Sequence, residues 1–199
     1  MKVVGLTGGI ACGKTAVSDR LAARGAAIID TDLLAREVVA PGEPALAEIV
    51  AAFGPEVLRP DGTLDRAALG AIVFADPAAR ERLNGITHPR VRARMRDRLA
   101  ALARQTPPPP VVVLVVPLLY ENGLEAWGQE SWVVDVPEAV QRSRLMARDG
   151  LDAAAADARI AAQMPRAERL ARATRVIENQ GDMAALDEAI ARVWAAARL

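Results

Sequence analysis

Short apolar runs alternate with longer amphipathic stretches along the chain. Val3–Thr7 and Ala26–Ile29 are almost continuously apolar and end at glycine or aspartate residues, which is typical of buried parallel strands. Helical periodicity, with Val17 and Leu21 on one face, follows the first strand. Later apolar runs predict three more strands, at Val111–Val116, Trp132–Val136 and Arg175–Glu178. The alternation predicts an α/β fold in three layers, with helices on both faces of a five-stranded parallel sheet.

A mostly helical insertion separates the second and third strands. The interval is about 80 residues, far longer than an ordinary crossover connection. We expect a long arginine-rich helix to begin only after His88-Pro89 and to run through Leu102. A second helical stretch, from Glu138 to about Pro165, follows the fourth strand. Turn residues break the insertion at Pro41-Gly42, Gly54-Pro55, Asp61-Gly62 and Asp76-Pro77.

The composition excludes several classes of protein. Basic and acidic residues number 25 each, and 52% of the residues are hydrophobic, which excludes a disordered chain. The neutral balance argues against a broad basic face for nucleic acid, and an aromatic content of 3% leaves few side chains for base stacking. No apolar run reaches the length of a membrane span, and a single cysteine cannot form an internal disulfide. We therefore expect a cytoplasmic protein that binds neither nucleic acid nor membranes.

A glycine-rich motif lies between the first strand and the helix after it. Residues 8–15 read GGIACGKT and match G-x-x-x-x-G-K-[ST], in which backbone N–H groups and a helix N-terminus hold phosphate oxygens. Lys14 would bridge the β- and γ-phosphates, and Thr15 would place its hydroxyl on Mg²⁺. The match is informative because Lys2 and Lys14 are the chain's only lysines. We expect ATP to contact Gly9, Ile10, Ala11, Cys12, Gly13, Lys14, Thr15 and Ala16.

Two carboxylates follow the second strand. Asp30 and Asp32 lie at its C-terminal end, where ligands bind in such sheets. The third strand carries no aspartate that could help to hold Mg²⁺, so that carboxylate must come from elsewhere. Asp30 is better explained as the cap of the helix that follows. Asp32 is the candidate for holding Mg²⁺ or for accepting a hydroxyl proton.

Arginines gather on the helix after the fourth strand. Arg144 and Arg148 are four residues apart and therefore share a face, with Arg142 close by. Two guanidinium groups on one face need solvent or a bridging anion, and phosphate matches their planar geometry. A solvated arginine-rich face is the alternative in a chain so rich in arginine. The position after the fourth strand, where small-molecule kinases carry a mobile lid, favours phosphate binding.

Taken together, these residues resemble the dephospho-CoA kinase family nearly from end to end. The Asp-x-Asp, Pro-Leu-Leu-x-Glu and Asn-x-Gly motifs are specific in this order, whereas the phosphate loop is generic. The resemblance rests on residues 6–10, 29–32, 35–36, 53–54, 61–62, Leu64, Arg66, Leu69, Phe74, His88-Pro89, 117–121, 144–149 and 176–181.

The resemblance implies transfer of the γ-phosphoryl group of ATP, with Mg²⁺, to the ribose 3′-hydroxyl of dephospho-CoA, the last step of coenzyme A synthesis. It implies a P-loop kinase core over 1–32, 107–141 and 166–199, an inserted helical acceptor domain over 33–106 and a helical lid over 142–165. ATP and dephospho-CoA would be the partners, and no obligate protein partner is evident.

The resemblance also implies a role for each matching residue. Asp32 would be the general base and, with Thr15, a ligand of Mg²⁺. Lys14, Arg144 and Arg148 would neutralise charge on the transferring phosphoryl group. The remaining implied contacts are Asn179 near the adenine of ATP and, on the acceptor side, Thr7, Asp32, Arg36, His88, Leu118 and Glu121.

Four residues depart from the family pattern. Ala11 and Cys12 replace a usual Gly-Ser pair, Thr174 stands where aspartate is common, and Pro165 interrupts the end of the lid region. Cys12, near a helix N-terminus and a lysine, is expected to have a lowered pKa and to react with alkylating reagents unless ATP protects it. The alternative is a small inert residue that points into the core behind the loop.

Other functions compete with this interpretation. A guanine-nucleotide switch is excluded because the chain has no lysine after Lys14 for an N-K-x-D motif and has no D-x-x-G motif. Another small-molecule kinase of the same fold, such as a nucleoside kinase, is opposed by the acceptor-side motifs. A non-catalytic ATP-binding module would be expected to lack the base or the lid arginines, and this chain has both.

Overall fold

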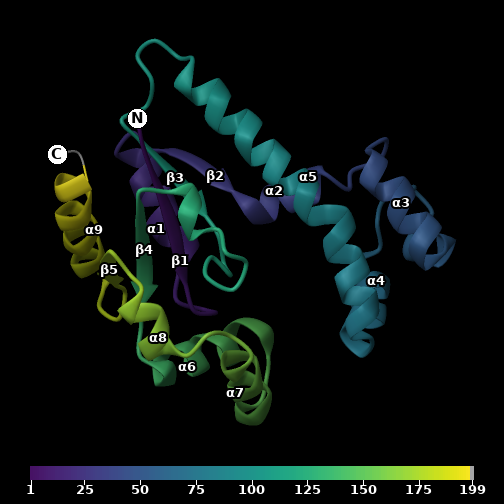
Figure 1. The fold of residues 1–199 in the computed structure, drawn as a ribbon. Coiled ribbons are helices and arrows are strands. Elements are labelled where there is room, and N and C mark those ends of the chain that lie inside the picture. The colour runs from purple at the N-terminus through teal and green to yellow at the C-terminus, as the bar shows by residue number, and fades with distance from the viewer. Residues whose placement is uncertain (198–199) are drawn as a thin grey trace. The chain divides into compact units, whose positions relative to one another are not determined.

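The computed structural model describes residues 1–197, which divide into two compact units (Figure 1). The first unit combines Met1–Ile29 with the chain from Leu102 onward, and the second is Asp30–Ala101. The first unit holds the sheet and the second is helical. Among the described helices, none is long and apolar enough to cross a membrane.

The sheet of the first unit has five strands in the order β2-β3-β1-β4-β5. The central strand β1 pairs in parallel with β3 and β4, and β4 pairs in parallel with β5. The predicted strands are therefore confirmed, with bounds that differ by one or two residues. The strands are β1 (Lys2–Gly8), β2 (Ala27–Asp30), β3 (Val111–Val115), β4 (Glu130–Asp135) and β5 (Arg175–Glu178).

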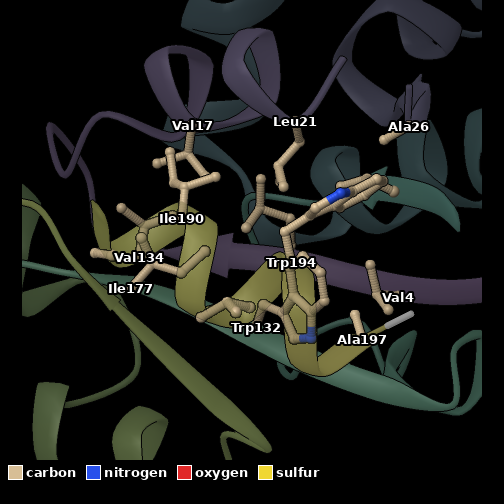
Figure 2. Packing of buried hydrophobic residues seen from close by; sticks show 14 of the residues in the cluster. Val4, Val17, Leu21, Ala26, Trp132, Val134, Ile177, Ile190, Trp194 and Ala197 are labelled. Carbon is tan, nitrogen blue, oxygen red and sulfur yellow. The ribbon is translucent and has the colours of Figure 1, made fainter. Parts of the chain in front are cut away.

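Two helices, α1 (Lys14–Ala23) and α9 (Met183–Ala197), pack on one face of this sheet. Figure 2 shows Val17 and Leu21 of α1 meeting Ile190 and Trp194 of α9 beside the strands. Trp132 of β4 is fully buried in the same cluster. Apolar side chains on alternate strand positions thus form the core that fixes α1, and with it the loop that precedes α1.

Three helices lie between β4 and β5 in the sequence: α6 (Glu138–Asp149), α7 (Ala153–Ala161) and α8 (Arg166–Ala171). A short 3₁₀ turn, Glu125–Trp127, precedes β4. Pro165 is the residue before α8, where its missing N–H costs no helical hydrogen bond. The interruption expected at Pro165 is therefore the boundary between α7 and α8.

The second unit has its own apolar core, which includes Ile49, Phe53 and Leu69. Turns at the expected proline and glycine residues separate its helices, and a single antiparallel bridge joins Leu58 to Leu64. The elements are α2 (Thr31–Glu37), α3 (Pro44–Phe53), the 3₁₀ turn Pro55–Val57, α4 (Arg66–Ala75) and α5 (Pro77–Ala103), whose last residues belong to the first unit.

The expectation that the arginine-rich helix begins after His88-Pro89 is wrong. Helix α5 starts at Pro77 and continues through Pro89 to Ala103. Proline cannot donate to the preceding turn, but side chains bond two carbonyls there: Thr87 Oγ1 to Leu83 at 2.9 Å and Arg90 Nη1 to Ile86 at 2.6 Å. The apolar core of the unit includes residues on both sides of Pro89, so packing keeps this turn within one continuous helix.

A network around Glu130 joins three parts of the first unit and generates a stability prediction. Its carboxylate accepts from Lys2 Nζ at 2.8 Å, Trp132 Nε1 at 2.8 Å and Arg175 Nε at 2.8 Å. The bonds from Arg175, followed by those from Lys2 and Trp132, lower the pKa of Glu130 from 4.5 to about 2. A carboxylate with a depressed pKa stabilises the fold above its unfolded pKa and loses that contribution as the pH falls through the folded value.

Glu130→Gln is therefore expected to lower the melting temperature at pH 7. The difference from wild type should shrink as the pH falls from about 4.5 to about 2, because the wild-type carboxylate is then protonated as well. Thermal unfolding across this range measures it, with Glu188→Gln on an exposed position of α9 as the control. A difference that does not change with pH would contradict the assignment to ionised Glu130.

Candidate active site

The loop between β1 and α1 has the geometry of an anion site. Gly13 has φ of 86° at the N-cap of α1, a left-handed conformation that suits glycine. No side chain of the described residues caps this helix end, so its first N–H groups are available to a ligand. Ala11 also has a positive φ of 59°, a conformation that costs a non-glycine residue about 1 kcal/mol.

Side chains donate hydrogen bonds to carbonyl groups of this loop. Lys14 Nζ donates to the carbonyls of Gly8 at 2.9 Å and Gly9 at 3.2 Å. Asn179, which is 7% exposed just after β5, donates from Nδ2 to the carbonyl of Cys12 at 2.8 Å. These carbonyl oxygens therefore already have hydrogen-bond donors from side chains. The N–H groups at the start of α1 remain for an anion.

The two predicted lid arginines differ in their surroundings. Arg144 of α6 is half-buried, and its Nη2 donates to the carbonyl of Asn179 at 2.8 Å. A Cβ placed on Gly13 would lie 3.9 Å from Arg144 Nη1, so this guanidinium is beside the phosphate loop. Arg148 is exposed and pairs with its neighbour Asp149 at 2.7 Å. The structure brings Arg144 to the loop and leaves Arg148 on the surface of α6.

Three predicted acceptor residues belong to the first unit. Thr7 is 1% exposed, and its hydroxyl donates to the carbonyl of Pro117 at 3.2 Å. Leu118 is exposed, and Glu121 accepts from the N–H of Met164 at 3.1 Å. Thr7 therefore joins β1 to the segment after β3, while Glu121 joins that segment to the residues before α8.

The other predicted acceptor residues belong to the second unit. The prediction that Asp30 caps a helix is confirmed: its carboxylate accepts from the N–H groups of Asp32 at 2.8 Å and Leu33 at 3.4 Å. Asp32 is exposed in the first turn of α2, and Arg36 is exposed four residues later on the same helix face. His88 is half-buried within α5.

A cluster of arginines in the second unit includes Arg36. Burial and then the positive charges of Arg36 and Arg59 lower the pKa of Arg66. Arg36 and Arg59 thus each act on Arg66, and the three exposed guanidinium groups form a basic surface that suits an anionic ligand. Of these three, only Arg36 is among the predicted acceptor residues.

The comparison with protein-family models decides the family. The model of the dephospho-CoA kinase family, CoaE, matches residues 2–185. This chain belongs to the dephospho-CoA kinase family. The predicted fold class, a three-layer α/β P-loop kinase fold, is confirmed with it.

Named relatives and solved structures agree with the family. A dephospho-CoA kinase from Anaeromyxobacter dehalogenans is 58% identical over 94% of this chain and 87% of its own length. The crystal structure of TT1252 from Thermus thermophilus is 36% identical, with a TM-score of 0.83, and covers 98% of this chain and 97% of its own. Dephospho-CoA kinase from Campylobacter jejuni is 28% identical, with a TM-score of 0.73, over 97% and 95% of the two chains.

Sequence reasoning missed three side chains that surround the phosphate loop: Gln141, Gln163 and Arg169. Gln141 and Gln163 bond to the backbone of Ile10, and Arg169 lies beside Gly9. Arg169 is only 6% exposed, which is unusual for arginine. In this arginine-rich region the sequence does not distinguish a buried arginine from a solvated one. The two glutamines belong to no recognised sequence motif.

The expectation of a lowered pKa for Cys12 is wrong. Cys12 is 1% exposed, and burial raises the pKa of its thiol, although Lys14 and Arg169 oppose the shift. Its Sγ lies 4.0 Å from Lys14 Nζ, behind the loop, and would also block a Cβ on Gly8. Cys12 is therefore the small, inert core residue that the alternative interpretation describes.

Brief alkylation of the folded, nucleotide-free protein at pH 7.5 is therefore expected to leave Cys12 unmodified. Its thiol is both buried and protonated, and the thiolate is the reactive form. Mass spectrometry measures the labelling, and the same protein in urea should label fully. Complete labelling of the folded protein within minutes would contradict the buried position.

Proposed function

We propose that this protein transfers the γ-phosphoryl group of ATP to the ribose 3′-hydroxyl of dephospho-CoA, as the last step of coenzyme A synthesis. The observation that carries the proposal is the family match over residues 2–185, which includes both the phosphate loop and the acceptor-side motifs. The loop geometry supports a phosphate donor, because a helix N-terminus, Lys14 and Arg144 come together there.

The first unit would bind the donor. Phosphoryl transfer depends mainly on positioning and on stabilising charge, so Lys14 and Arg144 would hold the phosphate oxygens as negative charge moves onto the leaving group. Asn179 would lie near adenine through its place beside the loop. Arg148 would reach the phosphates only with a rearrangement of its contact with Asp149. Residues 142–165 would act as the lid over this donor site.

Mg²⁺ fits the residues of the loop. Thr15 is exposed directly after Lys14 at the start of α1, and Mg²⁺ usually binds one or two protein oxygens together with phosphates and waters. Such a site needs no cluster of three ligating side chains, and the described residues contain none. We propose Thr15 and Asp32 as its protein ligands. When bound, Mg²⁺ would offset the negative charge of the phosphates.

The second unit would bind the acceptor. Asp32 would take the proton of the ribose hydroxyl, and it is exposed in the first turn of α2. The cluster of Arg36, Arg59 and Arg66 would suit the pyrophosphate of dephospho-CoA. His88 would complete this side, with Thr7, Leu118 and Glu121 from the first unit.

The only thiol is buried and unpaired with another cysteine, which supports a cytoplasmic location.

An acceptor comparison tests the proposed function. ADP formation from MgATP is measured with dephospho-CoA, adenosine and AMP under the same conditions. We expect dephospho-CoA to have the highest kcat/KM, because the basic cluster and the acceptor-side motifs would recognise more of it than of the smaller molecules. A higher kcat/KM for adenosine or AMP would overturn the proposal.

Asp32→Asn is expected to reduce kcat by roughly 10²–10⁴-fold, the usual contribution of a general base. Binding of ATP alone should remain within about threefold of wild type, because the phosphate loop keeps all its groups. Steady-state kinetics and a calorimetric titration measure the two quantities. Asp97→Asn, at an exposed position of α5 in the same unit, is the control. Turnover within about threefold of wild type would remove Asp32 from this role.

A further inference from the structure

Two glutamine side chains hold both backbone groups of Ile10 in the phosphate loop. Gln163 Oε1 accepts from the N–H of Ile10 at 2.6 Å, and Gln141 Nε2 donates to its carbonyl at 2.8 Å. Gln141 lies on α6 and is 3% exposed, whereas Gln163 follows α7 and is half-buried. The sense of each bond is fixed, because a backbone N–H can only donate and a carbonyl can only accept.

The space around these bonds is filled. A Cβ on Gly9 would collide with the amide nitrogen of Gln141 and would come within 3.1 Å of Arg169 Nη1. Gln141 therefore lies directly against the peptide that leads into Ile10. The orientation of that peptide is set by side chains from outside the loop.

The segment that carries Gln163 is itself held at the next residue. The N–H of Met164 donates to Glu121 Oε1 at 3.1 Å, and its carbonyl accepts from Arg169 Nη2 at 2.5 Å. Gln163 and Met164 thus connect the phosphate loop to the segment after β3 and to α8. The end of the region proposed as the lid therefore has three hydrogen-bond anchors within two residues.

We propose that Gln141 and Gln163 are positioning residues for ATP. They fix the Ile10 peptide, so that the N–H groups after it are oriented for phosphate before ATP arrives. They also couple residues 138–165 to the loop, because each glutamine belongs to that region. The inference rests on ATP binding to the loop, which the proposed function includes, and does not depend on which acceptor is used.

The opposite sense of the two bonds provides the test. Glutamate can still accept at position 163, but it cannot donate at position 141, where it would face a carbonyl. Leucine is similar in size and removes either bond. We therefore compare Gln141→Leu, Gln141→Glu, Gln163→Leu and Gln163→Glu. ATP affinity is titrated without acceptor in about 0.5 M salt, which weakens the long-range effect of the added charge.

We expect the order of glutamate and leucine to reverse between the two positions. At position 163 the glutamate variant should bind ATP within about threefold of wild type, and the leucine variant about tenfold more weakly, as loss of one hydrogen bond implies. At position 141 both should bind at least tenfold more weakly, and glutamate more weakly than leucine. KM for dephospho-CoA should stay within about twofold throughout.

Two results would overturn the proposal. If glutamate is the weaker variant at both positions, added charge explains the effect. If glutamate and leucine are equal at both, packing explains it. Melting temperatures identify any variant that does not fold, and the Gln163 pair alone then decides. If wild type binds ATP but does not phosphorylate dephospho-CoA, the proposed function fails while the glutamine comparison still stands.

Discussion

The position of β1 between two parallel partners constrains everything around the donor site. Its register against β3 and β4 is fixed on both sides, and both of its faces are buried. Gly5 makes this possible on one face, because a Cβ there would press on Leu119 at 3.0 Å. The carboxyl ends of the three strands therefore lie at the same edge of the sheet, and the phosphate loop begins there, directly after β1.

Hydrogen bonds from side chains to the backbone then shape the loop at that edge. Lys14, Asn179, Gln141 and Gln163 each bond to the main chain of the loop, although they come from four different places in the sequence. Apolar packing holds α1 behind the loop, but it does not orient single peptides. The fold thus supplies a rigid base, and polar side chains supply the orientation of the groups that would meet phosphate.

Features that depend on local sequence could be predicted, and features that depend on tertiary contacts could not. The strands followed from continuous apolar runs, and Asp30 was identified as a cap because its bonds reach only two and three residues ahead. Pro89 was misjudged because packing in the core of the second unit overrides its local preference. The pKa of Cys12 was misjudged because burial behind the loop outweighs the nearby lysine.

The buried position of Cys12 makes this protein convenient for site-directed labelling. Because it is the chain's only thiol and is 1% exposed, the native residue can stay in place. A cysteine introduced on an exposed position of α7 would then be the single accessible attachment point for a spectroscopic probe. The mobility of such a probe could follow the region between β4 and β5 during turnover, with the phosphate loop left in its natural sequence.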